Sequence, residues 1–112
     1  MPDPLPIEID VTTVKQMLDN GPEFMLLDCR EPGEHQTAHI EGATLIPMRE
    51  IPGKLPELES LKTARIVVHC HHGGRSMRVT QYLRENGFPN VQNMAGGIDA
   101  WSQIVDPSVP RY

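Results

Sequence analysis

One stretch restricts the possible folds of this chain more than any other: a predicted strand at residues 65–69 with an apolar centre, followed at once by a glycine-containing loop. Residues 66–68 are three consecutive β-branched residues, and such runs are typical of a strand buried on both faces. Strands of this kind belong to parallel sheets that carry helices on both sides. Gly73 and Gly74 then turn the chain toward a predicted helix over residues 75–86. The stretch therefore predicts a strand, a loop and a helix of an α/β domain.

The rest of the chain alternates strands and helices in the same way, which indicates a mostly parallel sheet. Gly87 is placed to cap the helix that begins near residue 75, with Phe88 near Leu83. In the last helix, Trp101 and its neighbours at helical spacing, Ile98 and Ile104, are expected to share one buried face. The other predicted elements are an edge strand at residues 7–9, a helix between a cap at Asp10 or Thr12 and a stop at residues 20–22, strands at residues 24–27, 44–46 and around Val91, and helical turns or loops at residues 32–43 and 48–61.

Length, charge and cysteine content exclude several classes of protein. The 112 residues suit one domain over residues 1–112, with a core at about residues 7–104 and a loose tail marked by Pro107 and Pro110. The net charge of −5 disfavours nucleic-acid and anionic-membrane partners, and the apolar runs are too short to span a bilayer. Two cysteines without a visible signal peptide indicate a soluble protein of a reducing compartment, the cytoplasm.

The segment after the apolar run carries the clearest chemistry. A cysteine reacts as its thiolate, and a helix N-terminus and nearby cations lower the pKa of the thiol. Cys70 is followed by both, because Arg75 supplies a cation and a helix is predicted to begin at about that residue. The backbone amides of the glycine turn can surround an anion, and Ser76 can cap the first turn of the helix. We therefore predict that Cys70 is a nucleophile, with an inert buried thiol as the alternative. The predicted anion-binding loop consists of His71, His72, Gly73, Gly74 and Arg75.

The histidines beside Cys70 also permit a metal-site interpretation. Adjacent residues rarely point at one ion, and the sequence offers no second Cys/His pair to complete a ligand set. We therefore predict no metal. His71 and His72 are interpreted as solvent-exposed residues at the mouth of the loop, where partial protonation attracts anions weakly.

A second polar cluster, residues 28–30, ends the strand predicted at residues 24–27. Because parallel strands end at the same edge of a sheet, it should lie beside Cys70. Arg30 either binds an anionic substrate at the pocket rim or joins Asp28 and Glu34 in a salt-bridge network; for these two carboxylates we favour the network. If Asp28 faces the site, alternation turns Cys29 away, so Cys29 is interpreted as a packing residue, with a resolving thiol as the alternative.

Four segments, taken together and in order, resemble the motifs of the rhodanese domains. Ala38 and Glu41 stand where members commonly carry Gly and Pro. The matching segments are residues 28–31 with Glu34, residues 38–43 with 46–47, residues 70–76 and residues 96–101.

The resemblance implies a central, mostly parallel five-stranded sheet flanked by helices, and a sulfurtransferase that needs no metal or organic cofactor. By family analogy, Cys70 takes a sulfane sulfur from a small anionic donor such as thiosulfate and passes it to cyanide or a cellular thiol. The alternative is a sulfur carrier or regulatory module that receives sulfur from a partner protein in a relay. A phosphatase or arsenate reductase is disfavoured, because related phosphatases place five residues between cysteine and arginine, whereas four separate Cys70 from Arg75.

Overall fold

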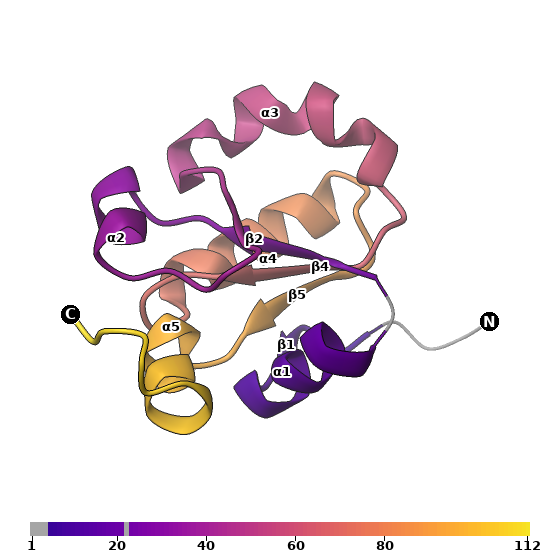
Figure 1. Cartoon of the computed structure of the whole chain (residues 1–112). Coiled ribbons are helices and arrows are strands. Elements are labelled where there is room, and N and C mark those ends of the chain that lie inside the picture. The colour runs from indigo at the N-terminus through magenta and orange to yellow at the C-terminus, as the bar shows by residue number, and fades with distance from the viewer. Residues whose placement is uncertain (1–4, 22) are drawn as a thin grey trace.

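The structure, a computed structural model, describes residues 5–21 and 23–112 and contains a five-stranded parallel sheet (Figure 1). The strand order is β1-β5-β4-β2-β3, which makes β1 an edge strand, as predicted, and places β4 at the centre. The strands are β1 (Glu8–Ile9), β2 (Met25–Asp28), β3 (Thr44–Leu45), β4 (Ile66–His69) and β5 (Val91–Met94). The α-helices are α1 (Val11–Asn20), α2 (Pro32–Thr37), α3 (Ile51–Leu58), α4 (Gly74–Glu85) and α5 (Gly97–Ala100).

Shorter helical turns complete the chain. Two 3-10 turns, η1 (Met48–Glu50) and η2 (Glu59–Leu61), flank α3, so residues 48–61 form helical turns as the sequence predicts. A π-helical turn, η3 (Trp101–Val105), continues α5.

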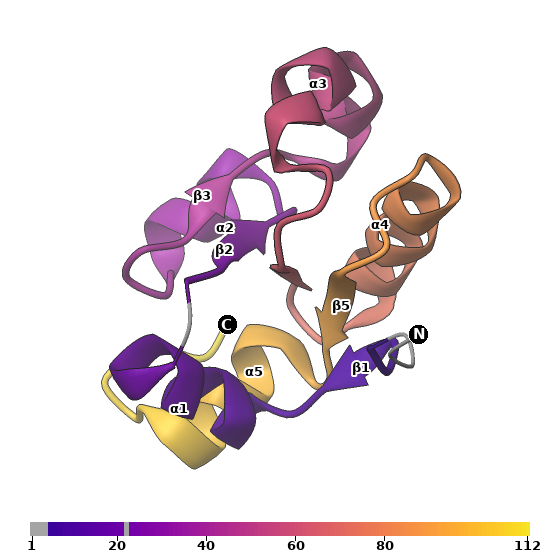
Figure 2. The same ribbon diagram turned by 90° about the vertical axis from the view of Figure 1, so that its right-hand side faces the viewer.

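The sheet separates two apolar layers, because alternate residues of each strand face opposite sides. On one side, Leu26 and Val67 pack with α1 and with Trp101. On the other side, Leu27 and Val68 pack with α3 and α4. Figures 1 and 2 show α1 and α5 on one face of the sheet and α3 and α4 on the other. β4 is buried along its whole length, which explains its unbroken apolar sequence.

The predicted helix ends are present. The Asp10 side chain accepts a hydrogen bond from the Thr13 amide at 2.7 Å and caps α1. Gly87 has a φ of +92° after α4, and the Phe88 amide donates to the Leu83 carbonyl at 3.0 Å, which forms a Schellman ending. Pro22, part of the predicted stop of α1, lies outside the described residues.

Two predictions for the C-terminal part of the chain are wrong. Ile98 and Trp101 are buried, but Ile104 is 66% exposed. The reason is the π-helical turn, in which the Asp106 amide donates to the Trp101 carbonyl five residues earlier. This wider turn rotates residue 104 off the buried face. The tail is also packed rather than loose, because Val109 is buried in the layer that contains Trp101.

None of the helices within residues 5–21 and 23–112 has the length and apolar composition needed to cross a lipid bilayer.

Candidate active site

The two polar clusters predicted at the sheet edge do meet. Asp28 of β2 pairs in register with His69 of β4, and the chain continues past both strands in step. The Cys29 amide donates to the His69 carbonyl at 3.1 Å, which extends the parallel ladder by one further bond. This pairing holds residues 28–30 beside Cys70 at the carboxyl edge of the sheet.

Cys70 lies at the base of the loop that leads into α4. It is buried, with 1% of its surface exposed. Its sulfur accepts a hydrogen bond from the Gly73 amide at 3.1 Å, and the Ser76 hydroxyl lies 3.3 Å away. A sulfur that accepts hydrogen bonds from such donors is stabilised in its anionic form. The loop therefore favours the thiolate form of Cys70.

Two glycines allow this close arrangement. Gly73 adopts a φ of +112°, a region that disfavours residues with a Cβ, and this turns its amide toward the sulfur. Gly97 begins α5 directly against the loop, where an added Cβ would stand 2.5 Å from the Cys70 carbonyl oxygen. The Ile98 amide donates to that same carbonyl at 2.9 Å. The Gly96-Gly97 motif thus fastens α5 onto the end of β4.

Ser76 has a different role from the cap predicted for it. It lies inside the first turn of α4, and Gly73 occupies the N-cap position. Its buried hydroxyl stands between the Cys70 sulfur and the Oδ1 atom of Asn93 on β5. The single hydroxyl proton serves one of these two acceptors at a time. Asn93 therefore helps to orient Ser76, and its part in the site has no signal in the sequence.

Cys29 is not turned away from the site. It shares one apolar cluster with Leu27, Val68 and Cys70 on the face of the sheet that packs with α4. Its thiol donates to the His69 carbonyl at 3.4 Å and is buried, with 1% of the residue exposed. The expected orientation was wrong because Asp28, not Cys29, points to the opposite face.

The environment of the two thiols separates their acidities. Contact with the Cys29 thiol, together with hydrogen bonds from Ser76 and the Gly73 amide, lowers the pKa of Cys70 to about 4, although burial opposes the shift. Contact with Cys70 and burial raise the pKa of Cys29. At neutral pH Cys70 is the ionised partner and Cys29 the protonated one.

Arg30 does not lie at the pocket rim. Its side chain is fully buried, and its Nε and NH2 groups donate to the two Asp28 carboxylate oxygens at 2.9 and 2.7 Å. The NH2 group also donates to the Ala38 carbonyl at 2.6 Å. His35 contacts the same carboxylate at 2.8 Å. Asp28 and Arg30 thus form an internal network that ties the end of β2 to the segment after α2.

Arg75 forms the outer rim of the loop. Its guanidinium donates to both Glu34 oxygens, at 2.7 and 2.9 Å, and this bidentate pair lowers the pKa of Glu34 to about 2. The Tyr112 hydroxyl donates to Glu34 at 2.7 Å and accepts from Arg30 at 2.9 Å. The rim therefore combines three parts of the chain that are distant in sequence.

The two loop histidines differ from each other. His72 is exposed, as predicted, whereas His71 is partly buried and stacks on the Tyr112 ring at 4.0 Å between centroids. Ligand atoms of His71, His72 and Asp99 lie within 4.8 Å of one another. Asp99 already accepts hydrogen bonds from Arg111 and from Gln103, both at 2.9 Å. The Asp99 carboxylate thus has hydrogen-bond partners other than the two histidines.

Comparison with known proteins assigns this architecture to a family. The model of the family described as "Rhodanese-like domain" matches residues 10–104. The chain belongs to the rhodanese-like domain family.

Relatives of this rhodanese-like domain include whole proteins and parts of longer ones. "Adenylyltransferase and sulfurtransferase MOCS3-2" of Zea mays is 43% identical over 103 residues, which cover 88% of this chain and 21% of that protein. The chain thus spans about a fifth of the length of the maize relative. A "Sulfurtransferase" of Allochromatium vinosum is 34% identical over 96 residues, which cover 86% of this chain and 88% of that protein.

A solved structure shares the fold. The crystal structure of a "Rhodanese-like Domain Protein from Staphylococcus aureus" has a TM-score of 0.79 and 30% identity, and the match covers 94% of this chain and 97% of that one. The five-stranded parallel sheet implied by the sequence motifs is therefore confirmed.

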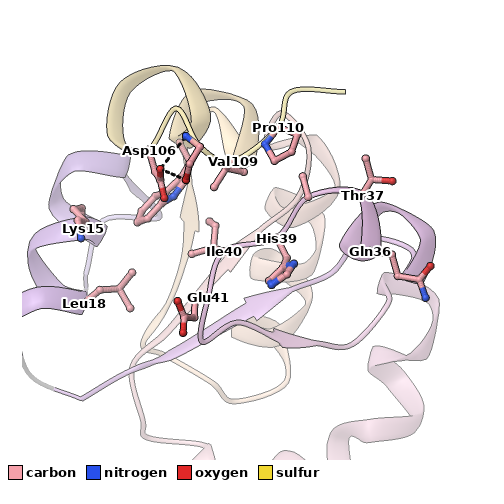
Figure 3. A pocket seen from close by; sticks show the side chains of 13 residues that line it. Lys15, Leu18, Gln36, Thr37, His39, Ile40, Glu41, Asp106, Val109 and Pro110 are labelled. Atoms are coloured by element: carbon pink, nitrogen blue, oxygen red, sulfur yellow. Dashed lines mark hydrogen bonds between the residues drawn. The ribbon is translucent and has the colours of Figure 1, made fainter.

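A separate pocket of about 750 Å³ lies between α1, residues 36–41 and residues 106–110 of the rhodanese-like domain (Figure 3). Charged and titratable side chains around it include Lys15, His39 and Glu41. The described residues that line this pocket do not belong to the 70–76 loop. It is therefore distinct from the surroundings of Cys70.

Proposed function

We propose that this rhodanese-like domain is a sulfurtransferase in which Cys70 carries the sulfur. The observation that carries the proposal is the hydrogen bond that the Cys70 sulfur accepts from the Gly73 amide at the base of the loop. This bond stabilises the thiolate form of Cys70. The names of the maize and Allochromatium relatives support the same reaction class. The cytoplasmic location and the single-domain organisation stay predictions from the sequence.

With thiosulfate as the donor, the reaction has two displacement steps. The Cys70 thiolate attacks the outer sulfur of thiosulfate, the sulfur–sulfur bond breaks, and sulfite leaves with the electron pair. The enzyme then holds an anionic persulfide. Cyanide attacks the outer sulfur of the persulfide, thiocyanate leaves, and the Cys70 thiolate is restored. Ping-pong kinetics follow, because the first product leaves before the second substrate reacts.

The loop residues have different parts in this scheme. Gly73 donates its amide to the Cys70 sulfur, and Ser76 supplies a hydroxyl at 3.3 Å. Gly74 and Arg75 begin α4, whose N-terminal dipole favours negative charge in the loop. His71 and His72 form the mouth toward Tyr112 and solvent. Arg30 holds Asp28 in place and is not proposed to bind substrate.

A sulfur carrier in a relay is a second candidate function. The burial of Cys70 does not distinguish the two roles, because 1% exposure limits a partner protein at least as much as a small donor. The maize relative, in which a matching segment forms about a fifth of the chain, is named for an adenylyltransferase as well as a sulfurtransferase. A partner protein that delivers sulfur to the loop fits the second activity in that name.

A phosphatase is less well supported. A phosphate cradle needs a guanidinium that is available to the oxyanion, and the Arg75 guanidinium is held by both Glu34 oxygens. The Cys70 loop is also one residue shorter than the loop of related phosphatases. Hydrolysis of p-nitrophenyl phosphate by the wild type, lost in Cys70→Ser, would overturn this judgement.

The deciding experiment measures sulfur transfer from thiosulfate to cyanide and the intact mass of the protein after thiosulfate treatment. We expect turnover and an adduct of one sulfur atom for the wild type, and neither for Cys70→Ala. Circular dichroism checks that the variant keeps its fold. An adduct without cyanide turnover favours the carrier role. Turnover in Cys70→Ala refutes the assignment.

A further inference from the structure

Cys29 and Cys70 form a pair across two neighbouring strands. Asp28 and His69 are register partners, and Cys29 and Cys70 follow them in step. Neighbouring strands lie about 4.8 Å apart, within the Cα separation of about 4.4–6.8 Å that a disulfide requires. Both side chains belong to the same apolar cluster on one face of the sheet. The backbone thus places the two thiols on neighbouring strands and on one face of the sheet, at a Cα separation that a disulfide can span.

The surroundings of the two sulfurs are unequal. Cys70 receives the Gly73 amide from the loop and lies beside the Ser76 hydroxyl of α4. Cys29 approaches from the β2 side and donates its proton to the His69 carbonyl at 3.4 Å. Both residues are 1% exposed, so the difference between the two sulfurs lies in their hydrogen bonds and not in their exposure. The nearest reactive partner of Cys29 is the Cys70 sulfur, whose pKa falls through contact with Cys29.

We infer that Cys29 is a resolving thiol, which displaces the sulfur from a Cys70 persulfide and closes a Cys29–Cys70 disulfide when an acceptor is lacking. This inference rests on the proposed function, since it requires a persulfide on Cys70. The sulfur bound to Cys70 then has two possible fates: transfer to an acceptor, or release as hydrosulfide.

The step balances without an external oxidant. The Cys29 sulfur attacks the Sγ atom of Cys70, and a bond forms between these two sulfurs. The bond between the Cys70 Sγ and the outer sulfur breaks, and the outer sulfur leaves with the electron pair. The Cys29 proton goes to this leaving sulfur, which departs as hydrosulfide. The sulfane sulfur is reduced and the two cysteines are oxidised. A dithiol reductant then restores both thiols by exchange.

A pairing of an ionised and a protonated thiol suits this sequence of events. The ionised Cys70 is the first to react with a sulfur donor, because the thiolate is the nucleophile. In the persulfide the negative charge lies on the outer sulfur, and this sulfur takes the Cys29 proton, so that Cys29 becomes a nucleophile as it attacks. A disulfide between adjacent strands is also constrained by the sheet, and constrained disulfides are the readily reduced ones. A dithiol reductant would therefore open the disulfide readily and restore both thiols for another round of loading.

The test follows the fate of one loaded sulfur. Wild type, Cys29→Ser and Cys29→Val are treated with thiosulfate, freed of small molecules and incubated without acceptor. Intact mass and released hydrosulfide are measured over time. Ser keeps a hydrogen-bond donor toward His69 and Val restores apolar packing, so a shared behaviour of the two variants reports the missing thiol alone.

We expect all three proteins to gain one sulfur atom, the two variants more slowly, because contact with the Cys29 thiol lowers the pKa of Cys70. In the wild type the adduct then disappears, a species lighter than the reduced protein by two hydrogen atoms replaces it, and one hydrosulfide is released per chain. The tryptic peptides of residues 16–30 and 66–75, which contain Cys29 and Cys70, should become linked. Both variants should keep the adduct at least tenfold longer and yield no such linked species.

Two results overturn the inference in distinguishable ways. If the wild type keeps its adduct as long as the variants do and forms no linked peptides, Cys29 does not resolve the persulfide, and the sulfurtransferase proposal stands. If none of the three proteins gains a sulfur atom from thiosulfate or from sodium tetrasulfide, the proposed function fails and the inference with it. The linked peptides are sought in the wild type, so this test does not depend on the folding of either variant.

Discussion

The buried Asp28–Arg30 pair leads to the sharpest prediction about stability. Both side chains have no exposed surface, and Arg30 donates to both Asp28 oxygens. In Arg30→Met the apolar replacement fills much of the same space but removes these two donors. Asp28 then keeps the amide of residue 30, at 3.0 Å, and His35, at 2.8 Å. The variant therefore contains a buried Asp28 carboxylate that has lost its positively charged partner and keeps only these two contacts.

Breaking a buried ion pair on one side costs about 3–5 kcal/mol of unfolding free energy. The remaining contacts of Asp28 place the expected loss for Arg30→Met near the lower end, about 3 kcal/mol. For a domain of this size, that loss lowers the melting temperature by about 12–20 °C. The whole stability of such a domain is about 5–15 kcal/mol, so the effect is large but does not prevent folding.

Urea unfolding followed by circular dichroism measures the loss. The matched control is Arg49→Met, because Arg49 pairs with Glu31 at 3.2 Å while its side chain is 71% exposed. Exposed pairs of this kind contribute at most about 1 kcal/mol. The double variant Asp28→Asn, Arg30→Met should recover part of the stability, since it no longer buries a charge. Equal losses for Arg30→Met and Arg49→Met would refute the reasoning.

The effect of Arg30→Met should depend on pH. Burial raises the pKa of Asp28, but the hydrogen bonds of Arg30 and His35 and the positive influence of His69 outweigh it and leave the pKa below its usual value. In the wild type the resulting stabilisation is present above the unfolded pKa of 3.8 and is lost as the pH falls through the folded pKa. Without Arg30 burial dominates and the carboxyl protonates more readily. The stability difference between the two proteins should therefore narrow as the pH falls from about 7 to about 4.

Three further predictions concern the loop. The ultraviolet thiolate absorbance of wild type minus Cys70→Ala should titrate near pH 4, because Cys70 has a pKa of about 4; a midpoint near 9 contradicts the proposed environment. Glu34→Gln frees Arg75 and removes one negative charge at the mouth, so KM for the thiosulfate dianion should fall about fourfold at low salt, as a change of one charge at about 10 Å in water predicts; an unchanged or higher KM contradicts this. Gly97→Ala should lose at least about 2 kcal/mol, because its Cβ would stand 2.5 Å from the Cys70 carbonyl oxygen and its φ is +60°. Gly33→Ala, which lies in α2 with open space around it, should instead gain up to about 1 kcal/mol; equal melting temperatures of the two variants refute this account.

Much of the fold could be predicted from local patterns. The apolar run at residues 66–68 identified the central strand, since a strand covered on both faces needs no polar alternation. Asp10 and Gly87 marked helix ends through hydrogen-bonding and backbone preferences that act within a few residues. Parallel strands then brought residues 28–30 to Cys70, as expected.

The placement of individual side chains at the site could not be predicted in the same way. Whether Asp28 or Cys29 faces Cys70 depends on the phase of β2 relative to the sheet, and a four-residue apolar run does not define that phase. Arg30 carries a charge that is usual at a surface, and its burial is compensated by Asp28 in the same segment and by partners in two others, Ala38 and Tyr112. Asn93 and Tyr112 reach the site through tertiary packing, which leaves no local pattern.

The distribution of the site along the chain has a consequence for the newly made protein. Cys70 acquires its acidity from Cys29, Gly73 and Ser76, and Ser76 is held in turn by β5. In an unfolded chain the thiol keeps a pKa near the ordinary value of 9.0, so about 1% of it is ionised at pH 7. A nascent or unfolded copy is therefore a poor acceptor of sulfur, and loading is confined to molecules in which the sheet has been assembled. Folding thus determines which copies of the chain can accept the sulfur that Cys70 is proposed to carry.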